Sequence, residues 1–483
     1  MIGKQKKLIL VALVACVLLG ATLFVLFSTV WKPTDTVGEK TGFLVEPLDM
    51  ALIQEISVKN RSYAWRLYRG EDNELYFEGA ERVLYNQNMI AYLRSCTAYL
   101  TSLGQVKEPV GMEEYGLTEE ACQASFSVTS TTGETYRVLV GDKLLGDRGY
   151  YARLDNSEEV HVLGTALERC LFGDLTFFLS GQVALYLSEN NYYEMTDFKI
   201  RRDGKDFVQI EMIPEDEVTD RDLSTHRVVY PAKYEPNTDL VTRIFKSFVS
   251  FVGEGVVAYD MRGKSTEEFT ALMQKYNFLS AAGDAMHCEV TYTHSDVTTT
   301  VYISRADADG YAYVYSPGFD VIAAFRAENL AWCEYDLMEY TQAEIFATSI
   351  SNVASIGVFG TDVEATFTLY HGESASDLVV KTERGTVKTQ DFRAFYAQLL
   401  FVTNDSYANY GEDYKDKQSL KLVIKMTDGA EKTFVFYDIE SLKSYYQVDG
   451  AGVFCVKRDY VKKLLSDAAK LLADKPVEAV QYA

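Results

Sequence analysis

The stretch GYYARLDNSEEVHVL (residues 149–163) has the pattern of two short strands around a turn, and the chain repeats that pattern twice. GYAYVYSPGFDVIAAF begins at residue 310 and SYYQVDGAGVFCV begins at residue 444. Each copy opens with a small residue and tyrosines, turns at Asp-Asn, Pro-Gly or Asp-Gly, and resumes with valine, as hairpins do. Three copies of one hairpin predict an internal repeat.

Each hairpin belongs to a longer pattern that also occurs three times. Short alternating strands come first, then an amphipathic helix, a pair of long strands, the tyrosine hairpin and a closing helix. Leu93, Ile244 and Phe395 lie on the apolar stripes of the successive first helices, 151 residues apart each time. The expected first helices span 86–104, 237–253 with Asn237 as N-cap, and 388–404 with Thr389 as N-cap; the expected closing helices span 164–179, 323–338 and 457–473.

The repeat predicts an α+β protein, because antiparallel hairpins dominate and helices are few. We expect an N-terminal transmembrane helix followed by three related α+β modules, each long enough for its own core. The predicted divisions are a basic cytoplasmic tip at 1–7, a transmembrane anchor at 8–30, a stalk at 31–46, modules at 47–182, 186–340 and 344–474, and a tail at 475–483.

The N-terminal segment predicts a single-pass membrane anchor. LILVALVACVLLGATLFVLFSTV (residues 8–30) contains no charge, and a helix of that length reaches about 34 Å, enough for a hydrocarbon core of about 30 Å. Lys4, Lys6 and Lys7 precede it, and Trp31 and Lys32 follow it. Because basic residues favour the cytoplasmic side, we expect the N-terminus inside and residues 32–483 outside the cell membrane.

Two other interpretations of this segment stay open. A cleaved signal peptide has an apolar core of about 7–15 residues and a small-residue cleavage site, which LFSTVWKP (residues 26–33) does not resemble. A bacterial lipoprotein signal would use LVAC (residues 13–16) and lipidate Cys16, although the apolar run continues beyond that cysteine. We expect the uncleaved anchor.

The chain has a net charge of −23, which argues against two kinds of partner. A nucleic-acid binder needs a basic surface, and no Lys/Arg stripe with interleaved aromatic residues occurs. An acidic chain is also repelled by anionic lipid headgroups, so we expect membrane contact through the anchor alone.

Six cysteines lie outside the apolar segment: Cys96, Cys122, Cys170, Cys288, Cys333 and Cys455. Cys122 and Cys288 both precede a strand pair, and Cys170 and Cys333 both fall in a closing helix. The repeat therefore predicts equivalent bridges, Cys122–Cys170 and Cys288–Cys333, with the other two cysteines outside the pairing. The alternative is that all are buried thiols at core positions. No Cys/His spacing indicates a zinc site.

The sequence contains no motif that indicates catalysis or a cofactor, such as a phosphate loop, a dinucleotide fingerprint or a GxSxG elbow. His161 in the first hairpin is replaced by Ile322 and Phe454 in the other copies, which indicates a packing position. DADG (residues 307–310) resembles the start of a calcium loop, but Gly318 stands where an EF-hand has glutamate, so we expect a turn. We predict no catalytic, cofactor-binding or metal-binding residue and a protein that is not an enzyme.

The segment MEEYGLTEEACQASFSVTSTTGETYRVLVGDKLLGDRGYYARLDNSEEVHVL (residues 112–163) carries a family resemblance. A helix with YL..L, then YGL, a strand ending in VG, and the GYYARLD hairpin resemble the bacterial family catalogued as domain of unknown function 4340, over about residues 47–180. Residues 276–279 (YNFL) replace YGL in the second module, and the likeness of the third is faint. The resemblance implies a membrane-anchored extracytoplasmic protein, often beside ABC-type export components of the gliding-motility type, with no catalytic residues to carry over.

Three functions follow as expectations. The first is a non-enzymatic anchored protein whose repeated modules bind a partner or act as a scaffold, as an accessory of an ABC permease and its auxiliary subunits. The second is a protein that binds a cell-envelope glycan or polymer through tyrosine-rich faces. The third, least favoured, is a hydrolase in acidic loops such as EDEVTDRD (residues 215–222).

Overall fold

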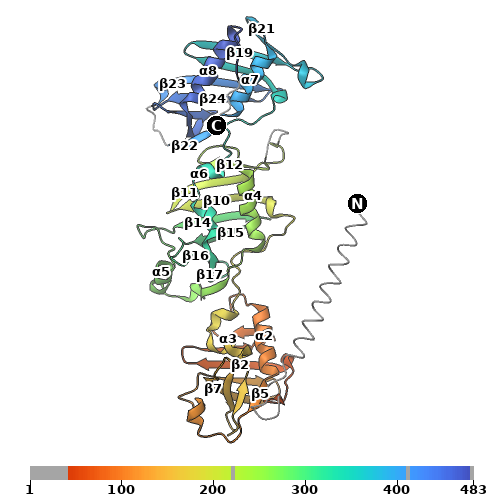
Figure 1. Ribbon diagram of the computed structural model, residues 1–483, viewed down its shortest axis with the longest axis vertical. Helices are drawn as coiled ribbons and strands as arrows, with labels where there is room; N and C mark the ends of the chain where they lie inside the picture. The colour runs from red at the N-terminus through yellow and green to blue at the C-terminus, as the bar shows by residue number, and fades with distance from the viewer. Residues whose placement is uncertain (1–41, 219–223, 409–413, 479–483) are drawn as a thin grey trace. The chain divides into compact units, whose positions relative to one another are not determined.

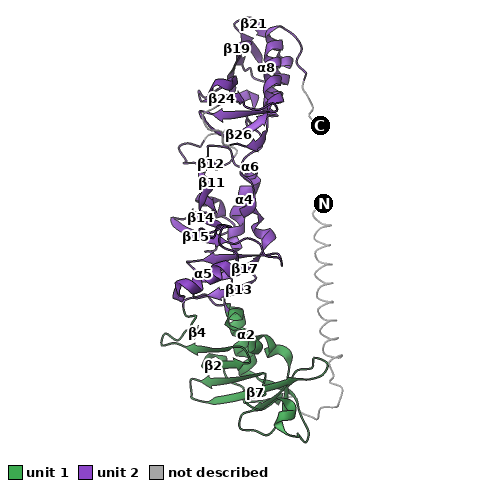
Figure 2. Cartoon of the chain, turned by 90° about the vertical axis from the view of Figure 1, so that its left-hand side faces the viewer, with its two compact units in different colours: residues 1–81, 86–178 green, residues 82–85, 179–483 purple. Residues whose placement is uncertain are grey.

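A computed structural model describes residues 42–218, 224–408 and 414–478 (Figure 1). The predicted tip, the anchor at 8–30, most of the stalk and the last five residues lie outside the described residues. The chain divides into two compact units, Met1–Glu81 with Asn86–Phe178 and Arg82–Tyr85 with Leu179–Ala483 (Figure 2). The first unit holds one sheet and the second holds two.

The first sheet has nine strands in the order β1-β5-β9-β8-β7-β6-β2-β3-β4, all paired antiparallel. The strands are β1 (Gly42–Phe43), β2 (Ile53–Asn60), β3 (Ala64–Arg69), β4 (Leu75–Phe77), β5 (Thr101–Gln105), β6 (Ala124–Ser130), β7 (Thr135–Lys143), β8 (Tyr150–Leu154) and β9 (His161–Leu163). The helices are α2 (Gln87–Ala98) and α3 (Glu168–Phe172), with 3₁₀ turns η1 (Met50–Leu52), η2 (Met112–Tyr115), η3 (Thr165–Leu167) and η4 (Leu175–Phe178).

The second sheet has the order β12-β11-β10-β14-β15-β16-β17-β13. Its strands are β10 (Met195–Arg202), β11 (Lys205–Met212), β12 (His226–Tyr230), β13 (Gly255–Tyr259), β14 (Cys288–His294), β15 (Val297–Ile303), β16 (Tyr311–Ser316) and β17 (Val321–Arg326). The helices are α4 (Thr238–Ser247), α5 (Thr266–Lys275) and α6 (Leu337–Tyr340), with 3₁₀ segments η5 (Tyr192–Glu194), η6 (Phe248–Ser250), η7 (Met261–Gly263) and η8 (Ala327–Glu334).

The third sheet has the order β21-β20-β19-β18-β23-β24-β25-β26-β22. Its strands are β18 (Val353–Gly360), β19 (Val363–Tyr370), β20 (Val379–Thr382), β21 (Gly385–Val387), β22 (Asn404–Tyr407), β23 (Gln418–Met426), β24 (Glu431–Asp438), β25 (Lys443–Val448) and β26 (Ala451–Lys457). The helices are α7 (Thr389–Leu400) and α8 (Arg458–Leu472), which lie side by side, with 3₁₀ turns η9 (Ile350–Asn352), η10 (Ala375–Asp377) and η11 (Lys415–Lys417) (Figure 1).

One topology accounts for all three sheets. If the eight strands that the modules share are numbered in chain order, leaving out β1 and β21, each sheet runs third, second, first, fifth, sixth, seventh, eighth, fourth. The pairing of the first strand with the fifth has an irregular register near its start in every copy, after Ile53, Met195 and Val353, all fully buried. A shared strand order together with a shared bulge supports the repeat that the hairpins predict.

The chain entering each module is bonded to that same module. In every copy, a backbone N–H of the entering segment donates to a carbonyl just after the first helix. The bonds are Leu44 to Leu100 (2.7 Å), Val183 to Phe251 (3.3 Å) and Ile345 to Val402 (3.0 Å). In the first module this contact includes β1, in residues that the sequence assigned to the stalk. The entry segment of the first module is thus an edge strand of its sheet, whereas those of the second and third form isolated bridges beside the first helix.

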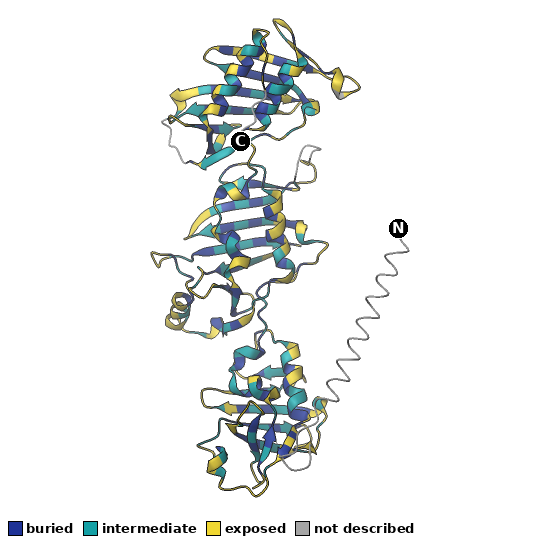
Figure 3. Ribbon diagram, in the orientation of Figure 1, coloured by how far each residue is buried: buried dark blue, intermediate teal, exposed yellow. Residues whose placement is uncertain are grey.

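The first helix of each module packs an apolar stripe on its sheet, as predicted. Leu93, Ile244 and Phe395, the residues at the 151-residue spacing, have exposures of 0%, 1% and 0%. Buried and less buried residues alternate along the strands, for example along β14 (Figure 3). Asn237 caps α4 as predicted, by accepting from the N–H of Leu240.

Several helix ends differ from the sequence-based expectation. The helix expected to reach Gly104 ends at Ala98, because Thr101–Gln105 pairs with β9 as strand β5. Lys388, rather than Thr389, is the N-cap of α7, and the Thr389 hydroxyl donates to the Leu378 carbonyl instead. In both cases contacts with the sheet outweigh a local helix signal.

The closing helices were predicted as one element in each module, and only the third is continuous. α8 has 15 residues, whereas the first module has the five-residue α3 between 3₁₀ turns. In the second module, the predicted helix start is strand β17, which pairs with β16, and a 3₁₀ segment follows. Hairpin pairing holds residues 323–326 extended despite their alanines.

Replacing Leu93 by alanine tests the core of the first module. We expect Leu93→Ala to lower the free energy of unfolding by about 2–5 kcal/mol, because it opens a cavity between α2 and the sheet. The matched control is Leu103→Ala, at a position that is 49% exposed in β5, where we expect a loss below about 1 kcal/mol. Scanning calorimetry of the full chain measures both, and equal losses at the two sites would contradict the assignment of the core face.

Candidate functional site

The repeated hairpins are part of the scaffold. Tyr150, Tyr315, Tyr445 and Tyr446 have exposures of 8%, 6%, 4% and 1%, so these rings fill cores rather than form an open face. His161 pairs opposite Ala152, and its Nδ1 lies 3.2 Å from the Ser102 hydroxyl. The feature that identifies the repeat in the sequence therefore stabilises each module from within.

The other histidines mostly bind backbone carbonyls. His226 Nε2 lies 2.7 Å from the Met195 carbonyl, and His371 Nε2 lies 2.7 Å from the Val353 carbonyl. Met195 and Val353 begin the first strands of their modules, next to the shared bulge. These imidazoles satisfy carbonyls near that irregularity.

Within the second unit, the segment after α6 connects the second module to the third through backbone hydrogen bonds. Gln342 N–H donates to the Glu235 carbonyl (2.9 Å), and Asn404 N–H donates to the Ala343 carbonyl (2.8 Å). The segment 342–345 is therefore hydrogen-bonded to both modules, and its Ile345 N–H donates to the Val402 carbonyl of the third.

Tyr234 is the principal side chain at this junction. Its hydroxyl oxygen accepts a hydrogen bond from the Val453 N–H at 2.7 Å, and its ring lies 4.8 Å from that of Phe454. Burial raises the pKa of Tyr234 well above its ordinary value. A second-module side chain thus contributes to the core of the third module.

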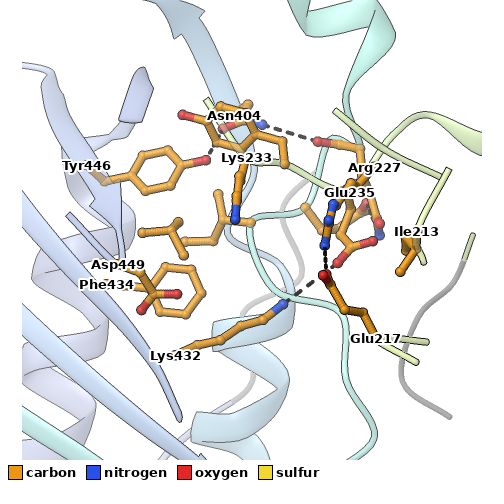
Figure 4. A pocket seen from close by; sticks show the side chains of 15 residues that line it. Ile213, Glu217, Arg227, Lys233, Glu235, Asn404, Lys432, Phe434, Tyr446 and Asp449 are labelled. Atoms are coloured by element: carbon orange, nitrogen blue, oxygen red, sulfur yellow. Dashed lines mark hydrogen bonds and ion pairs between the residues drawn. The ribbon is translucent and has the colours of Figure 1, made fainter. Parts of the chain in front are cut away.

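A cavity of about 260 Å³ lies at the junction (Figure 4). Its walls come from the loop after β12, from residues 342–345, and from β24 and β25 of the third module. Tyr446 and Phe434 form an aromatic wall, and the Tyr446 hydroxyl donates to Asn404 Oδ1 at 2.7 Å. Ligand sites often occur at such module boundaries, and the volume suits a ligand of monosaccharide size.

The carboxylates of the cavity have partners, whereas some cationic donors do not. Glu217 pairs with Arg227 Nη1 (2.6 Å), Glu235 lies 3.7 Å from Lys432 Nζ, and Asp449 accepts the Thr433 N–H. Arg227 Nε is buried without a hydrogen-bond partner among the described residues.

Lys233 extends into the same space (Figure 4). The remaining hydrogen-bonding capacity of the cavity therefore favours acceptor groups of a small polar ligand. No sequence motif marks Arg227, Lys233 or Tyr234, because each becomes part of the cavity only through contacts between the two modules.

The structure brings one predicted cysteine pair together. The thiols of Cys288 and Cys333 are buried, and burial and then the neighbouring Cys288 raise the pKa of Cys333 well above its usual value. In the first module Cys170 lies near Cys96, whereas Cys122 donates to the Glu119 carbonyl at 3.5 Å. The structure records no disulfide among the described cysteines, so the bridges stay predictions.

The acidic candidates form local contacts. Asp307 accepts from the N–H groups of Asp309 and Tyr311 and from the Tyr313 hydroxyl, which confirms the predicted turn. These hydrogen bonds lower the pKa of Asp307. Part of the acidic segment 215–222 lies outside the described residues. No group of three or more potential metal ligands occurs in the described part of the chain.

None of the helices in the described ranges has the length and apolar character needed to cross a membrane. Comparisons of the chain with family models, with curated proteins and with solved structures find no match.

Removing the Tyr234 hydroxyl tests the junction. We expect Tyr234→Phe to lower the free energy of unfolding by about 1 kcal/mol, because the half-buried Val453 N–H loses its acceptor. Hydrogen exchange at that amide should accelerate accordingly. The control Tyr230→Phe changes a ring that is 41% exposed and should leave the exchange unchanged. Unchanged exchange in Tyr234→Phe would contradict the contact.

His226 makes the stability of the second module depend on pH. Burial lowers the pKa of His226, although the bond to Met195 acts in the opposite direction. The unfolded chain therefore binds the proton more readily than the folded one, and this contribution to stability is present above about pH 6.5 and is lost as the pH falls below it.

We expect the difference in urea unfolding between pH 7.5 and pH 5 to shrink in His226→Gln. His371→Gln, a histidine change in the third module, is the matched control for the second-module transition. If wild type and His226→Gln change in parallel, the imidazole is not the group responsible.

Proposed function

We propose that this chain is a single-pass, membrane-anchored extracytoplasmic protein whose three modules act as a non-enzymatic scaffold for a protein partner. One observation carries the proposal: the same sheet topology occurs three times, and each copy is bonded to the chain segment that enters it. A repeated, self-contained module supplies several similar faces along one chain, as binding arrays do. The apolar segment at 8–30 supports the anchor.

The partner that we propose is an ABC-type permease with its auxiliary subunits. The resemblance of residues 47–180 to the domain of unknown function 4340 supports it, through the genomic association of that family. The net charge of −23 also favours a protein partner over an anionic lipid surface.

The junction cavity favours a second candidate, the binding of a cell-envelope glycan. Its aromatic wall, its amides and the Lys233 ammonium are groups that bind a polyhydroxylated, acceptor-rich ligand. Tyr370 and Tyr407, with exposures of 52% and 53%, add aromatic surface in the third module.

Photo-crosslinking in intact cells tests both candidates. Benzophenone side chains placed at the exposed positions Tyr63, Tyr370 and Tyr407 should crosslink the full-length protein to permease or ATPase subunits. The matched control is the same group at Tyr446, which is 1% exposed and should give no crosslink if the variant folds. Mass spectrometry of the purified adducts identifies the partner.

Adducts that lack transporter subunits, together with retention of the protein on purified wall polymer, would favour the glycan candidate. Lys233→Met should weaken that retention and Lys205→Met, an exposed lysine of β11 outside the cavity lining, should not. Protease treatment of spheroplasts tests the location: protection of residues 42–478 would overturn the extracytoplasmic assignment.

A further inference from the structure

The closing segments of the first two modules lack the support that the third has. α8 has 15 residues and packs on α7 and on the sheet, whereas α3 has five residues and η8 is a 3₁₀ segment. Short helices of this kind are not stable alone, because few hydrogen bonds offset the cost of ordering them. Contacts with their sheets hold these segments, such as the bond from the Asn60 amide to the Leu171 carbonyl and the packing of Trp332 on Phe198. Each segment also contains one buried cysteine, Cys170 or Cys333.

In the second module, two neighbouring contacts bring Cys333 to the sheet. His287 Nε2 lies 2.5 Å from Glu334 Oε1. The residues next to Cys288 and Cys333 are therefore in direct contact. Burial and then the neighbouring Cys288 raise the pKa of Cys333 well above its usual value, and Arg202 lies directly opposite Cys288 in the sheet. This pair is the one that the repeat predicts.

In the first module, the geometry gives Cys170 a different neighbour from the one that the repeat predicts. The Tyr92 hydroxyl of α2 donates to the Ala166 carbonyl at 2.6 Å. Cys96 and Cys170 each lie four residues further along, about one helical turn from that contact, and Cys96 adds to burial in raising the pKa of Cys170. Cys122 packs elsewhere, against the cluster of Leu117, Leu139 and Val160.

We propose that each of the first two modules carries one disulfide that fastens its closing segment, Cys96–Cys170 in the first and Cys288–Cys333 in the second. The first bond replaces the Cys122–Cys170 pairing that the sequence suggests. The proposal rests on the extracytoplasmic location given above, because disulfides persist in oxidising compartments. The disulfide fixes α3 or η8 to the rest of its module, as packing against α7 fixes α8.

The chemistry is ordinary thiol–disulfide exchange during folding, before burial closes the site. One cysteine thiolate attacks the disulfide of a thiol oxidoreductase of that compartment, which forms a mixed disulfide. The second thiolate displaces the enzyme. Each new S–S bond releases two protons and two electrons from the protein, and the electrons reduce the oxidoreductase to its dithiol form.

Thiol trapping in cells tests the pairing. Intact cells are treated with N-ethylmaleimide, and the full-length protein is digested without reductant for mass spectrometry. We expect linked peptides for Cys96–Cys170 and Cys288–Cys333, with Cys122 alkylated. A Cys122–Cys170 link, or alkylation of all four cysteines in a protein that protease reaches from outside, overturns the proposal.

If protease does not reach the chain from outside the cell, the proposed extracytoplasmic location is wrong. The cysteine pairing is then tested on purified protein. Incubation with oxidised glutathione in urea just below the unfolding midpoint, followed by dilution, should give the same two links. Their absence there overturns the pairing, and their presence supports it independently of the location.

Matched variants distinguish a disulfide from two free buried thiols. Adding reductant should lower the unfolding temperature of the first unit by about 5–10 °C in the wild type and in Cys122→Ser. Cys96→Ser, at a half-buried position, and Cys170→Ala should both abolish that reductant effect. A reductant effect that survives in Cys96→Ser, or one that is lost in Cys122→Ser, contradicts the pairing.

Discussion

The antiparallel pairing of each module's first strand with its fifth is the interaction on which the rest of the structure depends. In the first module it joins β2 to β6 across the helix and three other strands. The same pairing joins β10 to β14 and β18 to β23. Because it connects the early hairpin to the later strands, it turns two local meanders into one sheet with a continuous buried face. Loop closure of this length costs entropy, which the buried strands and the helix above them must offset.

The details around that pairing are repeated as well. Ile53, Met195 and Val353 start the first strands, are fully buried, and stand next to a register irregularity. In the second and third modules an imidazole binds the carbonyl of that residue. The modules therefore keep the central pairing and differ in their closing segments. In the third module α8 packs against α7, whereas the proposed disulfides hold the closing segments of the first two modules.

The junction in the second unit shows how a repeated scaffold can acquire a site without changing its sheets. Tyr234 and the segment 342–345 connect two modules, and the cavity beside them is lined by side chains that the repeat does not specify. Lys233 extends into that cavity, whereas Arg227 is paired with Glu217. The tyrosine hairpins, in contrast, contribute buried rings to the cores.

The sequence by itself determined the repeat, the α+β class, the first helices and the hairpins, because each is a local pattern of apolar spacing and turn residues. Leu93, Ile244 and Phe395 are buried as their spacing predicts. Tertiary structure alone decided which strands pair across each sheet, where α2 ends, that residues 323–326 are extended, and that Cys170 lies near Cys96. These outcomes depend on contacts between residues far apart in the chain, and no local pattern contains the energy of such contacts.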